Sequence, residues 1–262
     1  MAPSPRLRDR AYGWFGVILC FAALELLTRT ELVPSRHLPP PTATFRTLAG
    51  QLDQASLWRD LASTLAGWAI GLTMAAAIAV PLGVAAGSSA LLYRLLRFPI
   101  EFVRPIPAVA LVPLVVLVLG TGFESKVFLV ALAAVWPLLI QTVYGIQAAD
   151  PVATDTARAF GVRWPDRVLR VILPGALPYV ATGVRLSSSV ALTLAVTAEL
   201  VVGSDGLGRS ISLASEGGNT EALYSLIVVA GMVGWALNAG LACAERRVLH
   251  WHASVRRAEV PT

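Results

Sequence analysis

Long stretches of this chain contain no charged residue, and this feature constrains its fold more than any other. Asp, Glu, Lys and Arg are absent from residues 11–24, 61–93, 105–123, 127–149 and 222–244. About 20 apolar residues carry a helix across the hydrocarbon of a bilayer, and four of these stretches reach or approach that length. The segment 171–204 holds only Arg185 and Glu199, so it is a further candidate. The sequence predicts an all-α integral membrane protein with about six transmembrane helices.

The number and placement of the charged residues agree with a membrane chain. Only 14% of the residues are charged, whereas soluble domains have about a quarter. This disfavours a soluble enzyme, a secreted disulfide scaffold and a nucleic-acid-binding domain. Cytoplasmic loops collect Lys and Arg; with the N-terminus inside, 14 of the 21 basic residues fall in cytoplasmic segments and 6 outside, Lys126 among the 6. We therefore predict an uncleaved first helix and an N-in, C-in topology.

The second predicted span, residues 57–87, carries small side chains at every fourth position. They are Gly67, Gly71, Ala75, Ala79, Gly83 and Gly87. In lipid, small residues let two helix backbones approach closely, so this helix is expected to pack against protein along its whole length. Further spans are predicted at 108–119, 126–143, 174–202 and 222–243. Prolines at 99, 105, 107 and 113 predict that the third span is broken.

The loop 144–173, predicted to be cytoplasmic, is the most informative segment. Asp150 and Pro151 together favour a helix start, and Gly161 is a natural helix end. A second short helix is expected from Trp164 to near Pro174. The pair can form one apolar face, from Ala157, Phe160, Trp164, Val168 and Ile172. That face must be buried against the protein's own helices, lipid headgroups or a cytoplasmic partner.

The same loop resembles the EAA loop of ABC-importer permeases. Asp155, Ala157, Gly161, Leu173 and Pro174 fall on that pattern in register, while Asp155 stands for Glu, Thr156 for Ala and Val171 for Ile. In that family the loop supplies a coupling helix that docks on the ATP-hydrolysing subunit. The resemblance therefore implies a coupling role for Asp155, Ala157, Arg158, Phe160, Gly161, Trp164, Leu173 and Pro174.

Other motifs resemble one branch of these permeases, which serves nitrate, sulfonates, taurine and related solutes. They include Arg104-Pro105-Ile106-Pro107, Gly120-Thr121-Gly122, Gly183-Val184-Arg185 and Gly206-Leu207-Gly208, within residues 40–245. The resemblance implies a type I ABC importer permease (MetI-like) fold in a bacterial plasma membrane. It also implies three kinds of partner: a second permease copy, a cytoplasmic ABC ATPase dimer, and a periplasmic or lipid-anchored solute-binding protein. Which solute is carried stays open.

The residues themselves argue against catalysis within this chain. Lys126 is the only lysine and follows Ser125, so no G-x-x-x-x-G-K-[ST] phosphate loop exists. No paired carboxylates share a helix face, and His250 and His252 have no further ligand cluster nearby. We expect a transport subunit, not an enzyme, with no cofactor and no metal, whose ATP is hydrolysed by a separate protein.

Two ionisable residues lie at predicted membrane depth, and such residues are functional candidates. Arg185 and Glu199 are fourteen residues apart, about 21 Å along a helix, so each needs another partner or water. The candidate pathway comprises Arg185, Ser188, Ser189, Thr193, Thr197 and Glu199. Three alternatives remain: the hydroxyls bond neighbouring helices, Arg185 reaches the interface, and Glu199, near the outer mouth, is a structural residue that caps a helix or pairs across the dimer.

The predicted organisation has three parts. Residues 1–60 form a first span and an external amphipathic segment, 61–245 form the permease core with the coupling loop, and 246–262 form a cytoplasmic tail. The alternative function is an ion-gradient-driven secondary transporter or channel without an ATPase partner. An intramembrane enzyme would need a catalytic pair, and a mere anchor would leave the small-residue stripe and the broken span unexplained.

Overall fold

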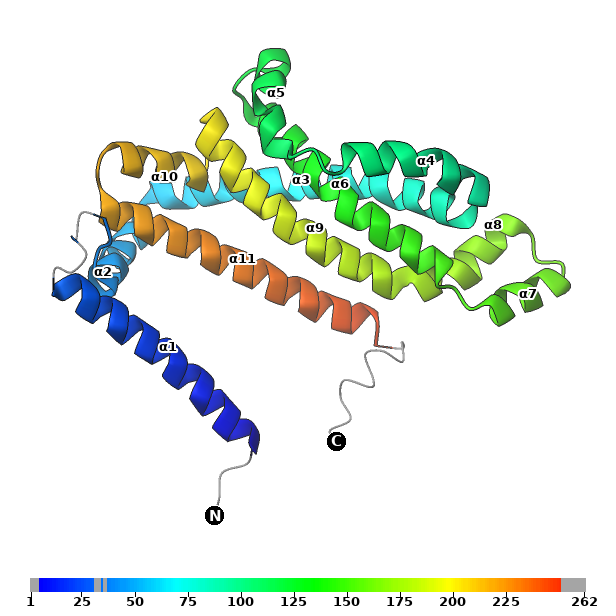
Figure 1. Ribbon diagram of the computed structural model, residues 1–262, viewed down its shortest axis with the longest axis horizontal. Coiled ribbons are helices and arrows are strands. Elements are labelled where there is room, and N and C mark those ends of the chain that lie inside the picture. The colour runs from blue at the N-terminus through cyan, green and yellow to red at the C-terminus, as the bar shows by residue number, and fades with distance from the viewer. Residues whose placement is uncertain (1–4, 31–33, 35–36, 251–262) are drawn as a thin grey trace.

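The computed structural model describes residues 5–30, 34 and 37–250, and over them the regular structure is helical (Figure 1). The elements are α1 (Pro5–Arg29), α2 (Pro41–Leu52), α3 (Ala55–Ser88), α4 (Ala90–Val103), η1 (Ala108–Leu111), α5 (Val112–Leu119), α6 (Phe123–Gln147), α7 (Pro151–Ala159), α8 (Trp164–Arg167), η2 (Val168–Ile172), α9 (Leu173–Val202), α10 (Leu207–Glu216) and α11 (Thr220–Val248). His252 and most of the predicted cytoplasmic tail lie outside the described residues. The all-α prediction is confirmed.

Four helical segments are long and apolar enough to cross a bilayer: α3, α6, the run Trp164–Val202, and α11. The bent pair α4 and η1–α5 makes a fifth if it counts as one span. These five agree with the second to sixth predicted spans. The helix α1 has 25 residues but is not among the candidates found in the described part of the chain, so the total of six stays a prediction.

The stripe of small residues on α3 packs against α6, as expected. A Cβ added at Gly67, Gly71, Gly83 or Gly87 would lie 2.5–2.8 Å from a side chain of Lys126, Val130, Thr142 or Ile146 respectively. The partner lies 59 positions further along the chain in every pair (67 to 126, 71 to 130, 83 to 142, 87 to 146). A constant offset means that α3 and α6 run in the same direction, so the segment between them must return across the bundle.

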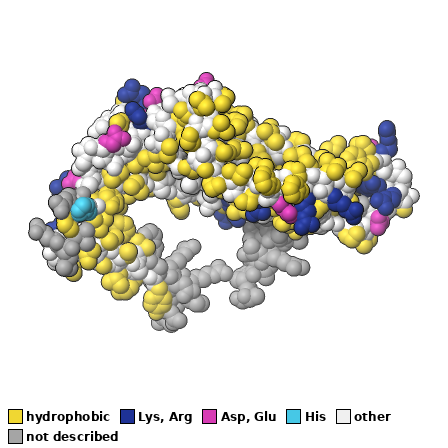
Figure 2. Space-filling view, turned by 45° about the horizontal axis from the view of Figure 1, so that its top comes forward, with side chains coloured by type: hydrophobic (Ala, Val, Ile, Leu, Met, Phe, Trp, Pro, Cys, Tyr) yellow, Lys and Arg dark blue, Asp and Glu magenta, His cyan; other side chains and the backbone are white. Residues whose placement is uncertain are grey.

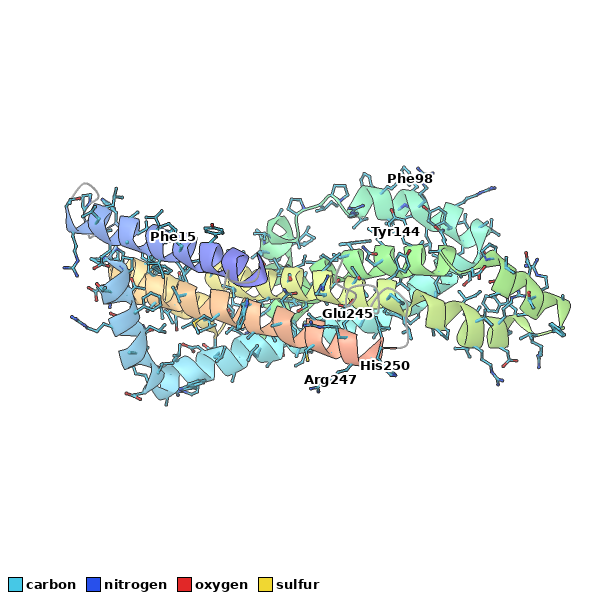
Figure 3. All side chains as sticks on the ribbon, turned by 90° about the horizontal axis from the view of Figure 1, so that it is seen from below. Phe15, Phe98, Tyr144, Glu245, Arg247 and His250 are labelled. Carbon is cyan, nitrogen blue, oxygen red and sulfur yellow. The ribbon has the colours of Figure 1, made fainter. Side chains whose placement is uncertain are left out.

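The returning segment is broken, as its prolines predicted. Residues 90–103 and 108–119 meet at an angle of 76°, so α4 lies along the bundle while α5 projects from it (Figure 1). Both halves leave apolar side chains uncovered: Phe98, 75% exposed, points away from the other helices (Figure 3), and Leu117 is 82% exposed. None of the residues that the structure describes covers these faces.

The long helices end at two different kinds of surface (Figure 1). The first surface, which we call the α10 end, carries α2, α10 and the N-terminal part of α3. The other, the α7 end, carries α7 and α8. Figure 2 shows apolar side chains over the middle of the molecule and basic side chains gathered toward the α7 end.

The helix α1 departs from the rest of the molecule beside α2 and diverges from the bundle (Figure 1). Its Glu25 carboxylate accepts hydrogen bonds from the backbone N–H of Thr42 at 3.1 Å and from the Thr42 hydroxyl at 2.7 Å. Phe21 and Phe45 pack with ring centroids 5.8 Å apart. These contacts hold α1 against α2. Most of the side chains of α1 that the structure describes are exposed.

Candidate functional site

The loop at the α7 end begins and ends its first helix as the sequence predicted. The side chain of Asp150 accepts a hydrogen bond from the backbone N–H of Val152 at 2.8 Å, which caps α7. After α7 the chain turns at Gly161, where φ is +72°. A Cβ at Gly161 would meet no atom within 4 Å, so the backbone conformation, not the space, favours glycine there.

The second helix of this loop does not end near Pro174, and that expectation was wrong. α8 passes through one π-helical turn, η2, directly into α9, and residues 164–202 form one uninterrupted run. In this turn the N–H of Leu173 bonds the carbonyl of Val168, five residues back. Proline lacks a donor and is tolerated in the first turn of a helix; here Pro174 occupies the first turn of α9. The loop is therefore joined rigidly to a membrane-spanning helix.

The predicted apolar face of the loop is divided in two. Val168 and Ile172 are buried with Ile146 and Ala176. Phe160 is 83% exposed and Trp164 is 52% exposed. The protein's own helices therefore cover the second half of the face, and the described residues leave the two aromatic side chains exposed.

The other predicted coupling residues surround those aromatics. Asp155 and Arg158 are exposed and form an ion pair at 3.7 Å, while Ala157 is half-buried. Leu173 and Pro174 are half-buried at the start of α9, where Leu173 packs on the cluster of Ile146. An exposed ion pair of this kind contributes at most about 1 kcal/mol to stability. Asp155 and Arg158 can therefore bind charged groups of another molecule in place of each other.

The hydroxyl groups of α9 fall into two sets. Ser187 is buried and donates to the carbonyl of Ala134 on α6 at 2.6 Å, and the Ser188 hydroxyl accepts from the indole N–H of Trp68 at 3.2 Å. These two join helices, as one alternative held. Ser189 and Thr193 are exposed and Thr197 is half-buried. Each donates to a carbonyl four residues earlier, at 3.4, 3.0 and 2.8 Å, so their remaining lone pairs face outward.

Ser189 and Thr193 of the second set, with Ser188 of the first, border a groove of about 410 Å³ between α9 and α11, whereas Thr197 is not among its lining residues. It is lined by Ser188, Ser189, Leu192, Thr193, Ala230, Gly231, Gly234, Trp235, Leu237 and Asn238. We call this the α9–α11 groove. Asn238 was not predicted, although a lone amide in the charge-free stretch 222–244 is a signal that could have identified it. Its amide offers two donors and one acceptor oxygen, so the groove combines hydroxyl, amide and indole chemistry.

Arg185 does not lie free in the membrane. Its guanidinium is 3.5 Å from the carboxylate of Glu245, near the end of α11 (Figure 3), and the two side chains are 40% and 22% exposed. Arg185 and Glu199 do not meet, as their spacing predicted.

Glu199 instead pairs with Lys126, and neither side chain has any exposed surface. We counted Lys126 among the outside basic residues and made it the first residue of the predicted span 126–143; it lies in the first turn of α6, with its side chain buried and not at an outer surface. Its ammonium donates to Glu199 Oε1 at 2.9 Å, to the carbonyl of Asp205 at 2.9 Å, and to the carbonyl and hydroxyl of Ser63 at 3.2 and 3.0 Å. Glu199 therefore does not line the α9–α11 groove in this conformation.

Known proteins resemble the chain over most of its length. Residues 79–248 match the family described as "Binding-protein-dependent transport system inner membrane component". The taurine transport system permease protein TauC of Escherichia coli K12 is 32% identical over 97% of this chain and 94% of its own length. The putative aliphatic sulfonates permease SsuC of Bacillus subtilis is 29% identical over 94% and 90%. The nitrate import permease NrtB of Leptolyngbya laminosa is 30% identical over 75% and 70%.

Two solved structures share the fold. A chain from inward-facing MetNI, a methionine ABC transporter, has a TM-score of 0.67 at 20% identity, with 74% of this chain and 97% of that chain covered. A chain from an amino acid ABC transporter crystallised with histidines has a TM-score of 0.58 at 18% identity, with 79% and 96% covered. The predicted MetI-like fold is thereby confirmed.

Proposed function

The chain belongs to the family of binding-protein-dependent transport system inner membrane components, and from that premise we propose that it forms the membrane pathway by which an ATP-driven importer takes up a small anion such as a sulfonate, taurine or nitrate. It is a multi-pass membrane permease of the ABC importer class. We place it in the bacterial plasma membrane, with the α7 end in the cytoplasm and the α10 end outside.

One observation carries this proposal: a single uninterrupted helical run bears both the candidate docking surface and the candidate pathway. The run begins at Trp164, which is one of the two exposed aromatic residues, and it carries Ser189 and Thr193 in the α9–α11 groove. A partner that moves the loop therefore acts directly on the helix that borders the groove. Alternating access requires this kind of mechanical connection between a distant energy source and the pathway.

The partners follow from surfaces that the chain leaves uncovered. We propose that a cytoplasmic ATPase dimer contacts Phe160, Trp164 and the charged residues around them, since a pump without a phosphate loop of its own needs an external source of energy. A second copy of the permease is proposed to cover the apolar faces of α4 and α5. A solute-binding protein is proposed to deliver solute at the α10 end.

The α9–α11 groove supports a small polar solute. Thr193 and Asn238 offer hydroxyl and amide groups, while Trp235 offers an apolar surface. Arg185 would provide the positive charge at the cytoplasmic side of the pathway, since Glu245 neutralises it only partly at 3.5 Å. The named relatives act on taurine, sulfonates and nitrate, which agrees with a pathway that accepts anions.

Co-purification with the ATPase tests the proposal against the ion-gradient alternative. The affinity-tagged protein is expressed with the ATPase and binding protein encoded beside it, extracted in detergent, and analysed for bound subunits and ATP hydrolysis. We expect a stable complex whose ATP hydrolysis rises when the loaded binding protein is added. A chain that retains no ATPase and transports solute alone would overturn the proposal.

A matched pair of groove variants tests the pathway itself. Thr193→Val removes the hydroxyl and preserves the shape of the side chain, whereas Thr182→Val makes the same change at a half-buried threonine of α9 outside the groove. We expect Thr193→Val to raise the KM of uptake several-fold and Thr182→Val to leave it unchanged. Equal kinetics in both variants would remove the groove from the pathway.

A further inference from the structure

The ion pair between Lys126 and Glu199 is saturated with hydrogen bonds inside the protein. Glu199 Oε1 accepts from Lys126, and Oε2 accepts from the hydroxyl of Thr64 and the backbone N–H of Gly208, both at 2.9 Å. The ammonium has four acceptors within 3.2 Å for its three protons. Because neither side chain has exposed surface, the pair is not accessible to a solute in this conformation.

The pair joins four parts of the fold at the α10 end. Lys126 belongs to α6 and Glu199 to α9, and Ser63 and Thr64 belong to α3. The fourth part is the loop 203–206 with the start of α10. The carbonyl of Asp205 binds the ammonium, and the N–H of Leu207 binds the hydroxyl of Thr64 at 2.9 Å.

Two glycines, Gly206 and Gly67, make room for the pair in the surrounding backbone. A Cβ at Gly206 would lie 2.1 Å from the carboxyl carbon of Glu199, and a Cβ at Gly67 would lie 2.8 Å from Cε of Lys126. Gly206 also has φ of +150°. The loop can therefore approach the carboxylate this closely only with glycine at that position.

Stability alone is a weak explanation for such a pair. Replacing a buried ion pair by apolar side chains of similar volume is often neutral or stabilising, because two charges need not then be removed from water. Buried charges do, however, fix one arrangement of the backbone groups that they bond. Here those groups belong to the loop 203–206 and to α10.

α10 closes the α10 end over the helices. Leu207 and Ile211 are buried in one cluster with Leu57 of α3 and with Leu226 and Val229 of α11. Glu199 stands near the last turn of the run that begins at Trp164, about 50 Å away along the helix. A displacement of the α7 end is thus carried by one helix to the residue that holds this loop.

We infer that Lys126 and Glu199 are positioning residues that make the loop 203–206 and α10 follow the end of α9, so that the ATPase cycle at the α7 end opens and closes the α10 end. The inference rests on the proposed ATP-driven import. The pair does not touch the solute; it transmits movement to the segment that would admit the solute from outside.

The test uses the permease in complex with its ATPase, in a background where Cys20 and Cys243 are replaced by serine. Ser204 is 6% exposed, so Ser204→Cys places a thiol that is covered in this conformation. Its labelling by a membrane-impermeant maleimide is followed without nucleotide and with trapped ATP. We expect the labelling rate to differ at least five-fold between the two states.

The decisive variant is the double substitution Lys126→Met and Glu199→Leu, which removes both charges together. We expect the complex to assemble and hydrolyse ATP, the labelling rate to become the same in both states, and the solute imported per ATP to fall at least ten-fold. The matched control is Arg97→Met with Glu101→Leu, which removes an exposed ion pair of 2.8 Å on α4. It should preserve the nucleotide response.

Two results would overturn the inference while leaving the proposed function intact. In the first, the double variant keeps nucleotide-dependent labelling and full uptake. In the second, a transporting complex with Lys126 and Glu199 intact shows the same labelling rate of Ser204→Cys with and without nucleotide. If the double variant fails to fold, Thr64→Val serves instead, because it releases Leu207 and Glu199 without unpairing a charge, and the same outcomes apply. Failure of the native chain to bind any ATPase would instead overturn the proposed function, and the inference with it.

Discussion

The two ends of the bundle handle charge in opposite ways. At the α10 end, Lys126 and Glu199 are fully buried and bonded at 2.9 Å. At the α7 end, the ion pairs Arg158–Asp155 and Arg170–Asp166 are 3.7 and 3.5 Å long and lie mostly exposed. At the α10 end the buried pair is bonded to groups of the protein itself, which fixes the local geometry. The α7 end leaves charged and aromatic side chains for a partner, which suits the end that receives the input of energy.

Breaking the buried pair on one side only should have the largest effect. Lys126→Met leaves the Glu199 carboxylate buried without its cation, and such a loss typically costs about 3–5 kcal/mol. We expect a large drop in the melting temperature of the detergent-solubilised protein. Arg170→Met is the control at the α7 end and should change it little, since an exposed pair contributes at most about 1 kcal/mol. Equal losses in the two variants would refute the contrast between the ends.

Removing the exposed aromatics should have the next largest effect, on assembly and not on folding. Phe160→Ala and Trp164→Ala are each expected to weaken ATPase binding by about 2 kcal/mol, roughly 30-fold, if they act as interface anchors. The affinity of the purified permease for its ATPase measures this. Phe15→Ala, at a similarly exposed aromatic of α1, should bind normally. Wild-type affinity in the loop variants would place the docking surface elsewhere.

A substitution at Gly161 tests whether the loop needs its defined backbone conformation for ATP-coupled uptake. A β-branched residue at φ of +72° is strained by about 1–2 kcal/mol, so Gly161→Val should uncouple uptake from ATP hydrolysis without unfolding the membrane part, and should lower the melting temperature by only a few degrees. Gly161→Asn is the control, because asparagine tolerates this conformation. Full ATP-coupled uptake by Gly161→Val would contradict the expectation.

The smallest expected effect concerns Arg185. Its ion pair with Glu245 is partly exposed, so it is intermediate between the buried pair at the α10 end and the exposed pairs at the α7 end. Arg185→Gln should raise the KM of anion uptake several-fold and leave the melting temperature nearly unchanged, since its pair with Glu245 is partly exposed. Glu245→Gln breaks the same pair but keeps the cation, so its KM should stay normal. If both variants shift KM equally, Arg185 only holds helices.

Features set by local sequence were predictable. The stretches with few or no charges predicted the second to sixth spans, the prolines predicted the break that the structure shows as a 76° bend, and the small residues of α3 predicted close packing, which the structure places against α6. Asp150 and Gly161 marked the ends of α7 because capping and positive φ depend on neighbouring backbone alone.

Features set by distant partners were not predictable in this way. Lys126 and Glu199 are 73 residues apart, and a helix spacing within one segment cannot reveal a partner in another. The only lysine and a carboxylate late in a span were the available signals, but the charge count placed Lys126 at the outer edge of the span 126–143 and gave it no partner. Likewise Pro174 suggested a helix end, whereas residues 164–202 continue through a π turn that lies directly before it.

Uptake by the reconstituted complex tests the central claim most directly. Permease and ATPase are placed in liposomes with the solute-binding protein outside, and labelled solute is followed with ATP sealed inside, without ATP, and with an imposed ion gradient alone. We predict accumulation only with internal ATP and binding protein, and its loss in the Phe160→Ala, Trp164→Ala double variant. Accumulation driven by the ion gradient without ATP or ATPase would contradict the account.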